Sequence, residues 1–264
     1  FIGNQSPSGG GMQIEAAENV TLTNVEFIEN IAHSYSAYWD SWDGIPSNYC
    51  DVGLEWNPVE CDASPNSGNY YFYPTYGGGL LIGSGSIDSL IMSNVLLHGN
   101  SAGIGGGMCS GTAEGYYGGV GGDVLLTNTT FVDNIAYGNP YGDARYGALS
   151  GDADYLTNTI MWNNIPNAMS NGSGIVSYSN IQDGEDWGEG SIDAEPEFTD
   201  PDNGDFTLQS TSPCIDSGDP SSDLDPDGTR ADMGAYPYDQ IENPIAWGCT
   251  DEEACNYDEW ATND

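Results

Sequence analysis

The chain has 264 residues, carries 41 acidic side chains against two basic ones, Arg145 and Arg230, and has a formal net charge of −39. This charge argues against binding to nucleic acid, to an anionic membrane surface or, unless cations bridge, to an acidic polysaccharide, because each of these is itself negative. No apolar run is long enough to cross a bilayer, so direct membrane insertion is not expected.

The sequence begins at Phe1 without a methionine or a signal peptide. Phe1 and Asn4 repeat the spacing of Phe27 and Asn30, so residues 1–11 resemble the end of an earlier repeat. We therefore expect a processed or truncated piece of a longer, secreted chain.

A repeated frame organises the next part of the chain, and its most regular copy reads DVLLTNTTFVDNIA. The copies are residues 19–32, 89–102, 123–136 and, more weakly, 153–166. Two asparagine columns recur in them, the first at Asn24, Asn94, Asn128 and Asn158, and the second six residues later at Asn30, Asn100, Asn134 and Asn164. The apolar positions beside the first column, such as Val20 and Leu22, alternate with the period of a β-strand.

A strand–bend–strand unit that cannot bury its apolar side alone must stack on copies of itself. Asparagines at the same bend of successive copies can then hydrogen-bond to one another. The repeats therefore predict an all-β chain, a right-handed parallel β-helix over residues 1–185, with both asparagine columns as ladders. A β-sandwich with coincidental Asn-rich turns is the alternative, and two columns kept over four copies disfavour it.

Each repeat opens with a cluster of small residues, and glycine there permits the tight corners of a solenoid. The clusters are residues 9–11, 77–79, 105–107 and 147–148. The sequence GGG followed by Met or Leu, and later by F-x-x-N, resembles the repeats of polymorphic outer-membrane proteins and of right-handed parallel β-helix proteins generally. This resemblance implies the fold but no activity, because such proteins serve as lyases, hydrolases, adhesins and inert stalks.

Insertions rich in aromatic residues separate the repeats, the longest at residues 33–76. Loops that leave the same corner of successive coils should emerge side by side and build one aromatic, acidic flank. About half of the aromatics would pack the long loop onto the coil, and the others would stack on sugar rings or contact another subunit. The predicted contact residues are Tyr38, Trp39, Trp42, Trp56, Tyr71, Tyr73, Tyr117, Tyr141 and Tyr146.

The C-terminal part predicts a cap at residues 186–238 and a linker with a tail repeat at 239–264. Residues 204–208, 212–218 and 225–236 resemble, in that order, the C-terminal end of many secreted bacterial β-helix proteins. This implies a segment that finishes the solenoid and shields its last coil. The tail, which begins GCTDEEACNY, resembles a short Cys-bearing repeat of large surface and secreted bacterial proteins, but stops before that repeat's further cysteine.

Six cysteines in a chain of secreted character predict disulfides. The expected pairs are Cys50 with Cys61, in the long insertion, and Cys249 with Cys255, in the tail. Cys109 and Cys214 either pair with each other or stay buried and free. No C-x-x-C pair occurs and His33 and His98 are isolated, so a zinc site is not expected, and His98 is expected on the surface.

Alternating aspartates followed by a glycine predict a Ca²⁺ loop near the C-terminus. The ligands would be Asp223, Asp225, Asp227 and Asp232, in a variant loop that lacks the bidentate glutamate of an EF-hand. Asp200, Asp202 and Asp205 form a second candidate site. The alternative is an Asp-rich turn in which Arg230 pairs with a neighbouring aspartate.

The candidate catalytic residues are few. Polysaccharide lyases of this fold use a Lys or Arg base near Ca²⁺, and only Arg145 could serve among the repeats. Glycoside hydrolysis needs convergent carboxylates, and Asp152 and Asp154 come nearest to such a pair. We therefore predict an extracellular or cell-surface structural or adhesive protein, such as a filament or sheath component. Its partners would be other copies of itself, other surface proteins or neutral glycans. A carbohydrate-active β-helix enzyme, a glycoside hydrolase or polysaccharide lyase, is the alternative.

Overall fold

The computed structural model describes residues 1–6, 9–14, 17–32, 36–40, 49–51, 69–73, 75–82, 87–110, 123–137, 146–151, 153–169, 174–184 and 187–242. Across these ranges the chain is all-β, apart from one short 3₁₀ helix, η1 (Pro201–Asn203). Among the same residues, no helix has the length and apolar character needed to span a membrane.

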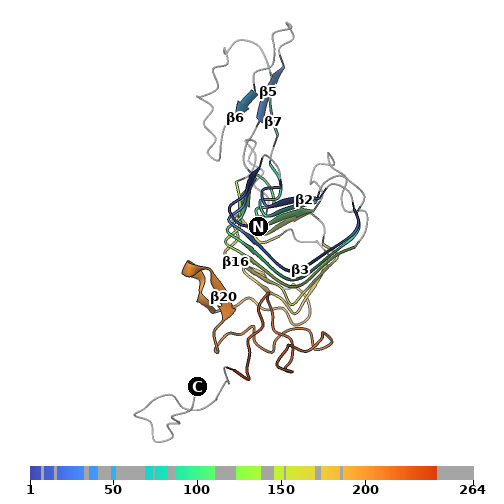
Figure 1. The fold of residues 1–264 in the computed structure, drawn as a ribbon, viewed down its shortest axis with the longest axis vertical. Coiled ribbons are helices and arrows are strands. Elements are labelled where there is room, and N and C mark those ends of the chain that lie inside the picture. Colours follow the sequence, from blue (N-terminus) through green and yellow to red (C-terminus); the bar gives the residue numbers. More distant parts are fainter. Residues whose placement is uncertain are drawn as a thin grey trace, which may run out of the picture.

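Three parallel sheets, here named A, B and C, contain most of the strands (Figure 1). Sheet A contains β3 (Ala17–Ile28), β9 (Ile87–His98), β12 (Asp123–Val132), β15 (Tyr155–Thr157), β16 (Ile160–Trp162), β17 (Ile175–Ser177) and β18 (Asn180–Ile181). Sheet B contains β1 (Gln5–Ser6), β4 (Ile31–Ala32), β10 (Ser101–Ala102) and β13 (Ile135–Ala136). Sheet C contains β2 (Met12–Ile14), β8 (Leu80–Ile82), β11 (Met108–Ser110) and β14 (Leu149–Gly151).

Along the chain, sheets B, C and A follow one another in the same order, and each such turn, here called a passage, stacks on the one before. The last passage reaches sheets B and C through single bridges at Ile165 and Met169. The prediction of an all-β chain built from stacked parallel strands is confirmed, and the arrangement is compatible with a parallel β-helix. Strand pairing also follows the repeat frame residue by residue, since Leu22 pairs with Met92 and Met92 pairs with Leu126. Equivalent apolar residues therefore lie above one another and merge into one buried core.

The bend within each long strand of sheet A lies at the first asparagine column. The φ angles of Asn24, Asn94, Asn128 and Asn158 lie between 48° and 54°. This left-handed region is unfavourable for most side chains, but asparagine enters it more readily. Local backbone preference therefore explains why asparagine recurs at this bend.

The middle glycine of each cluster is required by close approach of the backbones. A Cβ atom on Gly10 would lie 2.4 Å from the carbonyl oxygen of Gly78, and one on Gly78 would lie 2.3 Å from that of Gly106. A Cβ on Gly106 would lie 2.5 Å from the carbonyl oxygen of Ile135. These distances leave no room for a side chain, so the glycines permit the corners to stack.

The long insertion contains strands of its own. β5 (Ser36–Asp40), β6 (Tyr49–Asp51) and β7 (Asn69–Tyr73) form an antiparallel sheet in the order β6-β5-β7. The sequence predicted a loop here, although its aromatic residues are typical of strands. At the base of the insertion, the hydroxyl of Thr75 donates a 2.8 Å hydrogen bond to the carbonyl oxygen of Ala32. The insertion thus leaves and rejoins the stack at one place.

The C-terminal segment, residues 198–238, packs on the outer face of sheet A. It begins with an antiparallel hairpin of β19 (Phe198–Asp200) and β20 (Asp205–Leu208) and continues without regular strands (Figure 1, orange to red). Its apolar side chains cover outward-facing residues of several passages in a second cluster. That cluster contains Leu96, Val132, Ile160, Trp162, Phe198, Phe206, Leu208, Cys214, Met233 and Ala235.

The sequence predicted a cap at residues 186–238, and most of the described contacts of this segment lie along the side of the stack. The backbone N–H of Ala235 donates to the Thr130 hydroxyl at 2.9 Å, and the Gly234 N–H donates to the Asn158 carbonyl at 2.8 Å. These contacts lie on successive passages, so the segment runs along the side of the stack. The parts of the sheet A strands that follow the bend point apolar side chains outward. The C-terminal segment packs there because burial of these side chains removes apolar surface from water. At the end of the stack itself, Ile192 adds a single parallel bridge to Asn180.

Candidate functional site

The second asparagine column is a buried, continuous ladder. Asn30 donates its side-chain N–H to the Asn100 carboxamide oxygen at 2.9 Å, Asn100 to Asn134 at 3.0 Å, and Asn134 to Asn164 at 2.9 Å. Asn4 begins the column by donating to Asn30 at 2.9 Å. Each acceptor oxygen also receives the backbone N–H of the preceding asparagine. The column thus satisfies buried polar groups, which makes its role structural.

The first asparagine column is more exposed and less continuous. Asn94 donates to Asn24 at 3.2 Å, and Asn158 donates to Asn128 at 2.9 Å. The Asn158 side-chain oxygen accepts the backbone N–H of Asp219 at 2.6 Å. This column therefore also ties the C-terminal segment to sheet A.

Most predicted contact aromatics lie where side chains are not described. Tyr38 and Trp39 belong to β5, Tyr71 and Tyr73 belong to β7, and the backbone of Tyr38 pairs with that of Tyr71. Trp42, Trp56, Tyr117 and Tyr141 lie outside the described residues. Tyr146 has a described side chain, and it lines a cavity at the end of the stack.

The predicted disulfides also fall largely outside the description. Cys50 lies in β6, and Cys61, Cys249 and Cys255 are outside the described residues. Cys109 and Cys214 are both buried, in two separate hydrophobic clusters. Burial raises the pKa of the Cys109 thiol to about 12 and that of the Cys214 thiol to about 11. Such thiols are poor nucleophiles near neutral pH, because the thiolate is the reactive form.

The first predicted calcium loop uses its carboxylates within the protein. Asp232 is 2% exposed and accepts the backbone N–H groups of Asp216 at 2.7 Å and Tyr238 at 2.6 Å. Its own N–H donates to the carboxylate of Asp225 at 2.8 Å. Burial raises the pKa of Asp232 to about 7, and burial also raises the pKa of Asp225.

The remaining residues of that loop are Asp227, Asp223 and Arg230. Asp227 accepts the backbone N–H and the hydroxyl of Thr229, and these bonds lower its pKa. Asp223 is exposed. Arg230 donates to the carbonyl oxygen of Gly218 at 2.7 Å, rather than to a neighbouring carboxylate as the alternative supposed, and lies over the Tyr178 ring.

The second predicted calcium site is an exposed turn. Asp200 accepts the side-chain N–H of Asn203 at 2.8 Å, and Asp205 accepts the backbone N–H and hydroxyl of Thr207. Asp202 lies between them in η1. In the described part of the chain, no three His, Cys, Asp or Glu side chains come together as a metal site. Calcium binding at either aspartate set stays a prediction, which calcium titration tests.

His98 is less exposed than the sequence suggested. Its side chain is 17% exposed, and its ring centroid lies 4.5 Å from that of Phe206 on β20. Its Nδ1 atom lies 3.7 Å from the Asp133 carboxylate. The burial of His98 could not be predicted from the repeat, because Phe206, which covers it, lies about 100 residues further along the chain.

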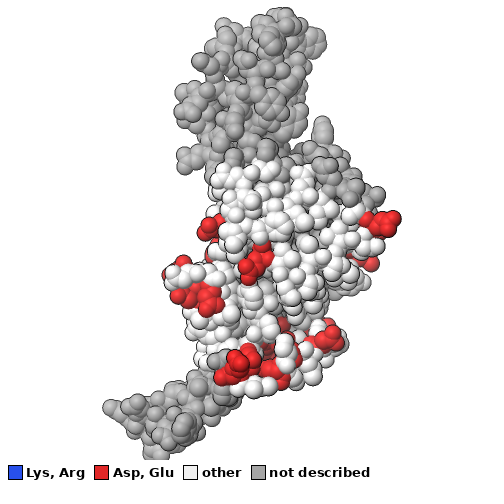
Figure 2. All heavy atoms as spheres, in the orientation of Figure 1, with Lys and Arg blue, Asp and Glu red and all other residues white. Residues whose placement is uncertain are grey.

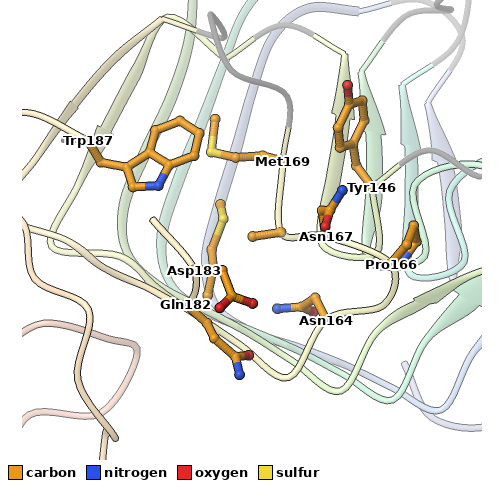
Figure 3. A pocket seen from close by; sticks show the side chains of 10 residues that line it. Tyr146, Asn164, Pro166, Asn167, Met169, Gln182, Asp183 and Trp187 are labelled. Carbon is orange, nitrogen blue, oxygen red and sulfur yellow. The ribbon is translucent and has the colours of Figure 1, made fainter. Parts of the chain in front are cut away.

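A cavity of about 420 Å³ lies at the end of the stack, beside the last passage (Figure 3). Residues from three parts of the chain line it: Tyr146, Met161, Asn164, Pro166, Asn167, Ala168, Met169, Gln182, Asp183 and Trp187. Figure 3 shows Trp187 and Tyr146 on opposite sides with Met169 between them, and Gln182, Asp183 and Asn164 below. Asp183 is the carboxylate among the described residues of this lining. Of these residues, only Tyr146 was predicted from the sequence as a contact residue, because the other contacts arise where the repeat loses its register.

The described surface is acidic around this framework, and Figure 2 shows its carboxylates in several separate patches. No family model, no curated protein and no solved structure matches this chain. The candidate site therefore rests on geometry alone. The carboxylate, amides and aromatic rings of the described lining offer hydrogen bonds and stacking.

Proposed function

We propose that this chain is an extracellular, right-handed parallel β-helix that serves as a structural or adhesive protein of a cell surface, filament or sheath. The constant order of sheets on every passage supports the solenoid. Its hand is inferred from the strong preference of crossovers between parallel strands for the right-handed sense. The repeated motifs then supply rigidity, and the insertions supply contacts.

One observation carries this proposal: the ladder from Asn4 to Asn164, which is buried from Asn30 onward. Its side-chain amides are committed to hydrogen bonds within the stack, as are the backbone N–H groups of Asn30, Asn100 and Asn134. The most regular residues of the chain are therefore used for stacking. This is the pattern expected of a rod whose task is mechanical.

The contacts of the rod are proposed to come from the aromatic insertions. Tyrosine and tryptophan are enriched in protein interfaces, because their large rings bury apolar area while the polar tip keeps a partner. The partners would be further copies of the chain, other surface proteins or neutral glycans. The net charge of −39 favours neutral or cationic partners over anionic ones.

Sedimentation velocity and negative-stain electron microscopy of the whole chain test this proposal. We expect concentration-dependent assemblies, or retention on immobilised neutral glycans, and both should weaken when Trp39 and Trp42 are replaced by alanine. Tyr155→Ala is the matched control, since Tyr155 is 47% exposed and belongs to β15 of sheet A, outside residues 33–76. A chain that stays monomeric and binds no glycan would overturn the proposal.

The second candidate, a carbohydrate-active enzyme, draws support only from the cavity. Among the described residues, Asp183 is the carboxylate that this lining offers. Release of reducing sugar from neutral polysaccharides, abolished by Asp183→Asn, would favour the enzyme over the structural protein.

A further inference from the structure

The cavity exists because the stack of passages ends beside it. Sheet C continues past β14 with a single bridge, between Leu149 and Met169. Met161 and Met169 are buried, yet they face the cavity where earlier passages place another layer of core. Apolar side chains at the end of a solenoid thus form the floor of a hollow.

Trp187 supplies the wall, and its position is fixed. A Cβ atom on Gly184 would lie 2.0 Å from both Cδ1 and Nε1 of the indole, so this glycine permits the ring to pack against the backbone. The Nε1 atom is buried, and it has no hydrogen-bond partner among the described residues.

Polar groups of the last passage complete the lining. The side-chain oxygen of Gln182 accepts the backbone N–H of Asn163 at 2.7 Å, which fixes the amide and leaves its NH₂ group to donate. Asp183 is exposed and adds acceptors, and Asn167, also exposed, adds a further amide. The lining therefore combines donors and acceptors with the aromatic rings of Trp187 and Tyr146.

We propose that this cavity binds a neutral saccharide of one or two rings. The apolar face of a sugar ring packs on an aromatic ring, while its hydroxyl groups both donate and accept hydrogen bonds, as Gln182, Asp183 and Asn167 require. The volume of about 420 Å³ lies within the usual range of ligand sites, roughly 300–1,000 Å³. A carboxylate in the lining and a strongly acidic chain disfavour an anionic ligand.

An organic cation is the competing ligand class, since cations also pack on aromatic rings beside a carboxylate. Two amides with free donor groups favour a sugar, because an N–H donor repels a cation. The inference does not depend on the proposed role of the rod. The cavity lies at the end of the stack and has no described part of the 33–76 insertion in its lining.

Saturation-transfer NMR and isothermal titration calorimetry of the whole chain test the proposal. The probes are glucose, galactose, mannose, N-acetylglucosamine and maltose, with choline as the cationic comparison. We expect at least one sugar to bind with a Kd of about 1 mM or tighter, and Asp183→Asn and Gly184→Ala each to weaken it by about tenfold or more. Asp183 is exposed, so its variant is expected to fold, and circular dichroism checks both.

Tyr155→Ala is the control outside the cavity and should leave the sugar affinity unchanged. Binding of no sugar, binding that survives both variants, or binding of choline in place of sugars would overturn the inference. Trp39→Ala with Trp42→Ala separates the two proposals: loss of glycan retention there, with sugar binding in the cavity intact, would leave this inference standing.

Discussion

The hydroxyl of Tyr236 donates a hydrogen bond to the carboxylate of Glu26, a residue 210 positions earlier in the chain. Glu26 lies in β3, the first strand of sheet A, whereas the neighbours of Tyr236 contact Asn158 and Thr130 on later passages. The C-terminal segment therefore reaches along sheet A to its first strand. It thus connects passages that are not adjacent, whereas each hydrogen bond of the asparagine ladders joins two adjacent passages.

Replacement of Tyr236 by phenylalanine should lower the free energy of unfolding by about 1 kcal/mol, since one partly exposed hydrogen bond to a carboxylate is lost. Urea unfolding of Tyr236→Phe, Glu26→Gln and the double variant measures the coupling between them. Tyr155→Phe, at an exposed position without this contact, should change little. Additive losses in the double variant would show that the two side chains do not interact.

The buried ladder should be far less tolerant of substitution than the exposed one. Asn134→Ala removes the acceptor of the Asn100 backbone and side-chain N–H groups, and the donor to the Leu97 carbonyl, all of them buried. Loss of about 3 kcal/mol or more is expected in urea unfolding. Asn94→Gly is the matched control, because glycine keeps the positive φ and loses only one exposed bond. Equal losses would contradict the structural ranking of the two columns.

The corner glycines should reject even a methyl group. Gly106→Ala places a Cβ atom 2.5 Å from the Ile135 carbonyl oxygen, which is backbone held in sheet B, so we expect a loss of about 3 kcal/mol or failure to fold. Gly204→Ala is the control, with a φ of 82° and no atom within 4 Å of its Cβ position. It should cost about 1 kcal/mol. Thermal unfolding compares them, and similar midpoints would argue against the close approach.

Asp232 should make the stability fall as pH rises. Its pKa is about 7 in the folded chain, because burial disfavours the charged form, whereas an unfolded aspartate has a pKa of about 3.9. The folded state therefore holds the proton more tightly, and this contribution is complete below about pH 4 and is lost as pH rises through about 7.

Urea unfolding at several pH values between about 4 and 8, in calcium-free buffer, measures that contribution. Asp232→Asn cannot ionise, so its free energy of unfolding should depend less steeply on pH than that of the native sequence. Asp193→Asn, at an exposed aspartate, should keep the native slope. A steeper pH dependence in Asp232→Asn would show that the carboxyl is charged in the folded chain.

Much of this architecture could be predicted because stacking copies the sequence pattern directly into space. The alignment that places Asn30, Asn100 and Asn134 in one column also gives the hydrogen-bonded partners, since each position of a repeat meets its own equivalent. The same logic extended to Asn4, which lies one passage earlier. Periodic patterns thus predict contacts over long sequence separations.

The cavity and the position of the C-terminal segment could not be predicted in this way. Trp187 and Gln182 meet Tyr146 only because the repeat ends, and no period relates them. The outward residues Leu96 and Ile160 gave no sign of which segment would cover them, since a covering segment is chosen by shape and apolar area. His98 was placed on the surface for the same reason.

The hydrogen bond between Thr75 and Ala32 has a practical consequence. It joins the two ends of the insertion at residues 33–76. The stacking of the passages on either side therefore does not depend on the sequence of the insertion. An unrelated domain whose own termini lie close together should therefore be accepted as a graft between these two residues. The stack would then serve as a scaffold that displays foreign cargo at a chosen height along its length.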